Sequence, residues 1–123
     1  ATQDLLQQGQ QQLDAGELAQ AELTFKEAVA QNPESALGYT RLGGVQLLRQ
    51  NHRAGIESFQ RAIALDPNNA DAFVGMALAY LHMGQYGLAK ASLQEAQRIA
   101  PDKREEIEKV LAWIDQRSPV SSH

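Results

Sequence analysis

Three of the four prolines in this sequence, Pro33, Pro67 and Pro101, stand 34 residues apart. An interval that recurs across a chain of 123 residues indicates an internal repeat, in which each unit buries its apolar face against its neighbours. Proline pushes the residue before it out of the α region, so each of these prolines should end a helix. The sequence therefore predicts three copies of one helical unit, each closed by a proline.

Residues of the same kind recur at the same places of each unit, counted from Thr2, Ala36 and Ala70. The fourth place holds a bulky residue, the eighth and twentieth hold small residues, the twenty-fourth is bulky again and the twenty-seventh is alanine. In that order the sets are Leu5, Tyr39 and Phe73; Gly9, Gly43 and Ala77; Ala21, Gly55 and Ala89; Phe25, Phe59 and Leu93; Ala28, Ala62 and Ala96.

These spacings are typical of two amphipathic helices per unit. Places 4, 7, 8 and 11 share one helical face, as do places 20, 24, 27 and 28. Small residues at places 8 and 20 allow the two backbones to approach closely while the bulky ones fill the space beside them. Each unit is thus predicted to be a helix A and a helix B of about 12 to 14 residues, or roughly 20 Å.

The turn between helix A and helix B holds Gly16 in the first unit and Gly84 in the third, where a positive φ is expected. The second unit has Gln50-Asn51 there, and asparagine tolerates the left-handed conformation. After each proline a polar residue is expected to cap the next helix, namely Ser35, Asn69 and Asp102.

One further apolar stripe at helical spacing follows Pro101, formed by Ile107, Val110, Leu111 and Ile114. No second helix follows it, so residues 103–117 are predicted to be a capping helix that closes the array. Trp113 lies one place off the stripe, and it either closes the end of the core, which we favour, or stays exposed. Residues 1–3 and the tail 118–123 are expected to be disordered.

Taken together, these residues resemble the tetratricopeptide repeat family. The second unit departs from the family's signature only at Gln46, where tyrosine is usual, and the first departs at Gln8 and Gln12. The third unit matches all eight signature positions by residue class, at Phe73, Met76, Ala77, Tyr80, Ala89, Leu93, Ala96 and Pro101.

The resemblance implies an all-α fold, a right-handed superhelical α-solenoid of about seven helices in a single domain. Its repeats would be residues 1–34, 35–69 and 70–102, followed by the capping helix. It also implies that the A helices line the inner curve of the superhelix, where tetratricopeptide repeats hold a peptide or helix of a partner protein.

Helical geometry then gives the residues that line this curve, because places 2, 5, 6, 9 and 13 lie opposite the core places. The candidate groove residues are Leu6, Gln10, Thr40, Arg41, Gly44, Leu48, Asp71, Val74, Gly75, Leu78 and His82. The same places also hold Gln3, Gln7, Asp14 and Leu37.

The third helix A is apolar on nearly every side, and a helix of that kind is normally covered all round. Val74 and Leu78 point away from its core face, beside a gap expected at Gly44 and Gly75. Two interpretations stay open. Either an apolar side chain or a helix of a partner fills this place, or Val74 and Leu78 pack sideways against Leu48 and the capping helix.

One specialisation of the family is not supported by the residues. Repeats that clamp the C-terminal carboxylate of cytosolic heat-shock chaperones carry lysine, arginine and asparagine at five groove places. Only Arg41 among the residues at those places could meet a carboxylate; the full set here is Leu6, Gln10, Arg41, Asp71 and Gly75.

Composition excludes several other functions. The net charge is −4 without a basic stripe, which argues against nucleic-acid binding. No apolar run approaches a membrane span, and the absence of cysteine excludes disulfides and thiolate sites. The three histidines, His52, His82 and His123, are spread too widely in the sequence to suggest a metal or catalytic site. We therefore predict no enzyme activity, no cofactor and no metal.

The sequence predicts a binding module for another protein, whose identity it does not give. The alternative is a structural or self-associating segment of a larger bacterial protein, of the kind used in secretion, pilus, polysaccharide-export or envelope assembly. An excess of arginine over lysine, seven against four, suggests a bacterial origin. A cytoplasmic and a periplasmic location are both compatible with the sequence.

Overall fold

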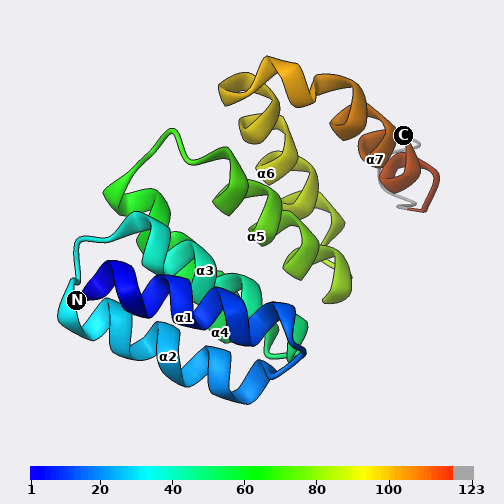
Figure 1. The fold of residues 1–123 in the computed structure, drawn as a ribbon. Helices are drawn as coiled ribbons and strands as arrows, with labels where there is room; N and C mark the ends of the chain where they lie inside the picture. The colour runs from blue at the N-terminus through cyan, green and yellow to red at the C-terminus, as the bar shows by residue number, and fades with distance from the viewer. Residues whose placement is uncertain (118–123) are drawn as a thin grey trace.

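The computed structural model describes residues 1–117, which form seven α-helices and one 3₁₀ turn. Successive helices stack in chain order from the N-terminus to the C-terminus (Figure 1). The predicted all-α solenoid is confirmed. The elements are α1 (Thr2–Asp14), α2 (Leu18–Gln31), α3 (Ala36–Leu48), α4 (His52–Leu65), α5 (Ala70–His82), α6 (Tyr86–Ile99), η1 (Pro101–Lys103) and α7 (Arg104–Arg117).

Glycine and phenylalanine meet where the two helices of the first and second repeats cross. A Cβ atom added to Gly9 would lie 2.5 Å from the ring of Phe25, and one added to Gly43 would lie 2.8 Å from Phe59. Both distances are too short for a real Cβ, so the rings occupy the space that glycine leaves free. The third repeat instead has Ala77 at the glycine's place, in one buried cluster with Leu93.

Two of the three glutamines that depart from the family's signature, Gln12 and Gln46, have a hydrogen-bond partner at the same crossing. The Thr24 hydroxyl donates to Oε1 of Gln12, and the Ser58 hydroxyl donates to Oε1 of Gln46. The oxygen–oxygen distance is 2.6 Å in both bonds. Gln46 and Ser58 are both buried, so this bond satisfies polar groups that water does not reach. In the third repeat the corresponding hydroxyl, on Ser92, donates to its own helix, at the Leu88 carbonyl.

An ionic cluster joins α2 of the first repeat to the end of α3. Glu22 accepts from Nη1 of Arg49 over 2.7 Å and pairs with Nζ of Lys26 at 3.1 Å, although its side chain is only 9% exposed. Burial alone would raise the pKa of Glu22, but the hydrogen bonds from Arg49 and Lys26 outweigh it and lower the pKa below its ordinary value.

Helix caps and turns mostly follow the sequence-based expectation. The side chains of Ser35 and Asn69 each accept a hydrogen bond from the backbone N–H group three residues later, at 2.9 and 3.0 Å respectively. The expected cap at Asp102 is wrong, because Asp102 lies inside η1 and makes no such bond. In the second A–B turn the positive φ, 68°, falls on Gln50 and not on Asn51.

The capping helix exists, but it starts at Arg104, one residue later than expected, because η1 comes first. Ile107 and Ile114 are buried against the third repeat as predicted. Trp113, which we expected to close the core, is 43% exposed and lies under the guanidinium of Arg117, 4.2 Å from its ring centroid. At the other end, helix α1 already starts at Thr2, so disorder of residues 2 and 3 was a wrong expectation. The expected disorder of 118–123 lies outside the described residues.

Candidate partner-binding groove

The first hollow along the A helices lies between α1 and α3 and has a volume of about 350 Å³. Its walls combine amide side chains with two leucines and one cation, Arg41, which donates a hydrogen bond to Gln10. The full lining is Gln3, Leu6, Gln7, Gln10, Leu37 and Arg41. Every one of these residues stands at a place that the periodicity predicted to face the groove.

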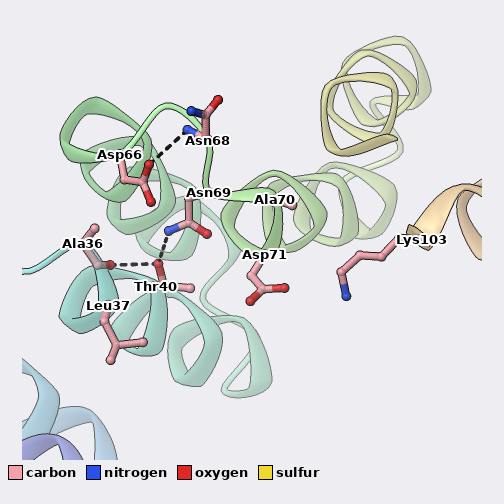
Figure 2. Close-up of a pocket in the computed structure, with 9 residues that line it drawn as sticks. All are labelled: Ala36, Leu37, Thr40, Asp66, Asn68, Asn69, Ala70, Asp71 and Lys103. Carbon is pink, nitrogen blue, oxygen red and sulfur yellow. Dashed lines mark hydrogen bonds between the residues drawn. The ribbon is translucent and has the colours of Figure 1, made fainter. Parts of the chain in front are cut away.

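The second hollow, of about 360 Å³, lies between α3, the loop before α5 and η1 (Figure 2). Some of its polar groups already form hydrogen bonds within the protein. The Thr40 hydroxyl donates to the Ala36 carbonyl and accepts from the Asn69 side-chain amide, each at a distance of 2.8 Å. Asp71 and Lys103 extend into the same space from α5 and η1 (Figure 2). The Asp71 carboxylate and the Lys103 ammonium are therefore the charged groups best placed to contact a partner in this hollow.

The third hollow, of about 180 Å³, separates α5 from α7 and has mostly apolar walls. Neighbouring A helices α1 and α3, and α3 and α5, have Cα atoms within 8 Å of one another, but α5 and α7 do not. In the view of Figure 1, α7 lies beside α6 and apart from α5. Its lining is Asp71, Val74, Ala77, Leu78, Leu81, Leu93, Lys103, Glu106, Ile107 and Val110.

Shared residues join the three hollows into one groove, here named the A-helix trough. Leu37 lines the first and second hollows, and Asp71 and Lys103 line the second and third. Two leucines along it are strongly exposed, Leu37 at 51% and Leu78 at 44%. The trough thus runs from α1 to α7 and presents apolar surface to solvent.

Seven of the eleven candidate groove residues line the trough: Leu6, Gln10, Thr40, Arg41, Asp71, Val74 and Leu78. Gly44 has open space beside it, and Leu48 is 55% exposed outside the three hollows. Gly75 is misplaced in the expectation, because it is buried and an added Cβ would overlap the ring of Phe59. It leaves space for a core ring from the preceding repeat and opens no gap for a partner.

Val74 and Leu78 face the third hollow together with Ile107 and Val110 of α7. The capping helix therefore does stand opposite them, as one of the two interpretations held, but it leaves a space between. Leu48, which that interpretation also named, is not part of this lining.

The structure brings two of the three histidines together, which the sequence did not indicate. The rings of His52, the first residue of α4, and His82, the last of α5, stack with centroids 5.0 Å apart and planes 7° from parallel. Nδ1 of His52 is buried and has no hydrogen-bond partner among residues 1–117. His82 thus belongs to the contact between the second and third repeats. Over the same residues no three His, Cys, Asp or Glu side chains are grouped as a metal site would need.

Lys103 and Glu106 are trough residues that the sequence reasoning missed, as are Asp66, Asn68 and Asn69 of the loop before α5. If the 34-residue register is continued past Pro101, Glu106 falls near the core face of α7. The register does not give the distance between α7 and α5. None of the helices within residues 1–117 is long and apolar enough to cross a membrane.

Parts of known proteins have related sequences. The peroxisomal targeting signal receptor of Pichia angusta is 35% identical over 77 residues, which make up 63% of this chain and 14% of the receptor. This chain thus spans about a seventh of that relative.

Solved structures share the fold over nearly the whole chain. The TPR2B domain of yeast Sti1, solved as a complex with pHsp70, has a TM-score of 0.91 at 20% identity, over 95% of this chain and 98% of that one. The Yersinia enterocolitica type III secretion chaperone SycD, in complex with a peptide of the translocator YopD, gives 0.87 at 17% identity, over 94% and 92%. A bacterial origin stays a prediction, because these relatives include yeasts as well as a bacterium.

Two family models, both described as tetratricopeptide repeat, match residues 6–70 and 46–114. Each match covers more than half of the sequence, and together they span residues 6–114, which include parts of all three repeats and most of α7. The chain belongs to the tetratricopeptide repeat family.

Proposed function

We propose that this protein holds an extended peptide or a helix of another protein in the A-helix trough. The observation that carries the proposal is the continuity of the three hollows through Leu37, Asp71 and Lys103, with exposed leucines along the way. Exposed apolar side chains grouped in a concave surface are typical of protein-binding sites. Family members are generally interaction modules without catalysis, and the proposal gives this chain no catalytic role.

Two of the related structures support this choice of occupant. The yeast Sti1 domain and the SycD chaperone were both solved with part of a partner protein bound, pHsp70 and a YopD peptide respectively. Their identity to this chain is low, so the partner here has to be inferred from this trough and not from theirs.

The test is selection of random 12-residue peptides displayed on phage, followed by fluorescence anisotropy with the enriched peptides. Leu78→Glu should abolish binding by placing a charge in the apolar part of the trough, while the melting temperature changes little because Leu78 is 44% exposed. Leu23→Glu, on helix α2 and outside the trough, is the matched control with an exposed leucine and should bind like wild type.

Survival of both peptide binding and thermal stability in Leu78→Glu would contradict the proposal. Sedimentation at several protein concentrations should be run alongside. Self-association that Leu78→Glu abolishes and Leu23→Glu retains would make a second copy of the chain the occupant instead.

A further inference from the structure

The third hollow differs from the rest of the trough in shape and lining. It arises because α7 follows a 3₁₀ turn and stands away from α5, so the apolar face of α5 lacks the close neighbour that α1 and α3 have. Val74, Leu78 and Val110 contribute to its walls. Its volume, about 180 Å³, is comparable to the roughly 150 Å³ of an apolar protein cavity that takes up benzene. It has room for one large apolar side chain.

Charge is distributed unevenly along the trough. The second and third hollows are lined by three carboxylates, Asp66, Asp71 and Glu106, against one ammonium, that of Lys103. Among residues 1–117 none of these four makes an ion pair within 4.0 Å. The first hollow, at the other end, contains Arg41 as its charged side chain. The trough is therefore acidic around the apolar hollow and basic at the far end.

We propose that the occupant is a peptide segment of a partner protein with a large apolar residue seated between α5 and α7 and a lysine or arginine beside it. The basic residue meets Asp71 and Glu106 at the rim of the hollow, and an acidic residue further along the segment meets Arg41. This inference rests on the proposed function and specifies the chemistry of its partner.

The trough also sets the length of the segment. The two steps from α1 to α3 and from α3 to α5 span roughly 16–20 Å at the usual 8–10 Å interaxial distance, and the wider gap between α5 and α7 adds to this span. An extended chain rises about 3.3 Å per residue, so roughly five or six residues cover these two steps and further residues are needed to reach α7. The hollow that contains Arg41 and the hollow that holds the anchor are two such steps apart, so the acidic residue should stand roughly five or six positions from the apolar anchor.

The experiment compares the phage-selected 12-residue peptides of wild type with those of Asp71→Lys/Glu106→Lys. Both substitutions are at exposed positions, and circular dichroism checks that the double variant is folded. Wild type should enrich an apolar residue next to lysine or arginine, and the double variant should enrich one next to aspartate or glutamate. Glu105→Lys, an exposed neighbour on α7 outside the hollows, is the control and should select like wild type.

Measurements on one selected peptide keep the test independent of the protein variants. Replacing its anchor by alanine should weaken wild-type binding about 10- to 100-fold, because a buried side chain loses its apolar contacts. Replacing its basic residue by glutamate should weaken binding roughly tenfold, and the charge-reversed protein should recover that loss. A benzophenone placed at the anchor should cross-link to α5 or α7.

The outcomes separate the two proposals. Peptides that bind without the apolar–basic pair, a motif unchanged by the charge reversal, or a cross-link to α1 or α3 would overturn this inference and leave the groove function standing. Enrichment of no peptide by folded wild type would overturn both.

Discussion

The first two repeats and the third solve the crossing of their helices differently. In the first two, a glycine on helix A accepts the ring of Phe25 or Phe59, and a glutamine accepts a hydrogen bond from Thr24 or Ser58. In the third, an alanine faces the smaller Leu93, Tyr80 takes the glutamine's place, and the hydroxyl of Ser92 turns to its own helix.

This difference teaches that the repeat preserves the sum of two side chains and not each side chain separately. Glycine plus phenylalanine and alanine plus leucine fill similar space, as close packing of a core requires. Likewise an acceptor on helix A appears only where helix B supplies a hydroxyl that points at it. Substitutions that change one member of a pair should therefore cost more than substitutions that change both.

The largest effect is expected from Gly43→Leu, because the new side chain would collide with the ring of Phe59. The free energy of unfolding should fall by about 3 kcal/mol or more, at the upper end of overpacked cores. Urea denaturation followed by circular dichroism measures it. Gly44→Leu is the adjacent control, since nothing lies within 4 Å of its added Cβ, and equal losses in the two variants would refute the pairing.

A somewhat smaller loss, about 1–3 kcal/mol, is expected from Leu93→Phe in the third repeat, because Ala77 leaves less room than glycine does. Ala77→Gly/Leu93→Phe recreates the pair of the first two repeats and should recover most of that loss. A double-mutant cycle by urea denaturation gives the coupling energy. Additive effects of the two substitutions would show that the residues fill their space independently.

Gln46→Leu removes the acceptor of the buried Ser58 hydroxyl and should cost about 1–2 kcal/mol. Adding Ser58→Ala should restore much of the stability, since then neither polar group is left unsatisfied. Tyr80→Phe is the corresponding change in the third repeat and should cost less than about 0.5 kcal/mol. Thermal melts of the four variants, wild type included, decide between these outcomes.

The smallest effect concerns acid. The pKa of Glu22 is below its ordinary value of 4.5, so the stability that its ion pairs contribute is complete above pH 4.5 and is lost as the pH falls through the lowered pKa. Glu22→Gln should remove about 1 kcal/mol at pH 7, the upper end of what such ion pairs contribute, and should flatten the decline of stability below pH 4.5. The pH dependence of urea midpoints measures it.

Glu95→Gln, at a different place of the third repeat, provides an exposed ion pair for comparison. Hydrogen bonds from Arg98 lower the pKa of Glu95, but this pair is exposed to solvent, which screens it. Its substitution should alter the acid limb of the stability curve less than Glu22→Gln does, and the reverse order would contradict the role of burial.

Sequence alone was sufficient for the helices and for the small and bulky positions, because a threefold repeat fixes where the backbone must turn and which faces meet. It was not sufficient for α7, since the apolar stripe of Ile107 and Ile114 is compatible with many angles to α5. Gly75 was misassigned because helical geometry within α5 does not show that Phe59 reaches it from the preceding repeat. The pair of His52 and His82 has no counterpart in the other repeats, so the repeat pattern could not predict it.

The ring of Phe59 bears on how such a chain can be recombined with others of its kind. Because it lies against Gly43 in its own repeat and Gly75 in the next, a chimera with its breakpoint at Pro67 inherits one condition from upstream. Any foreign repeat grafted there needs glycine at the sixth place of its first helix. Otherwise Phe59 of the upstream repeat has to be replaced by a smaller residue. Repeats of equal length are thus interchangeable only where the two side chains that meet across their junction fit each other.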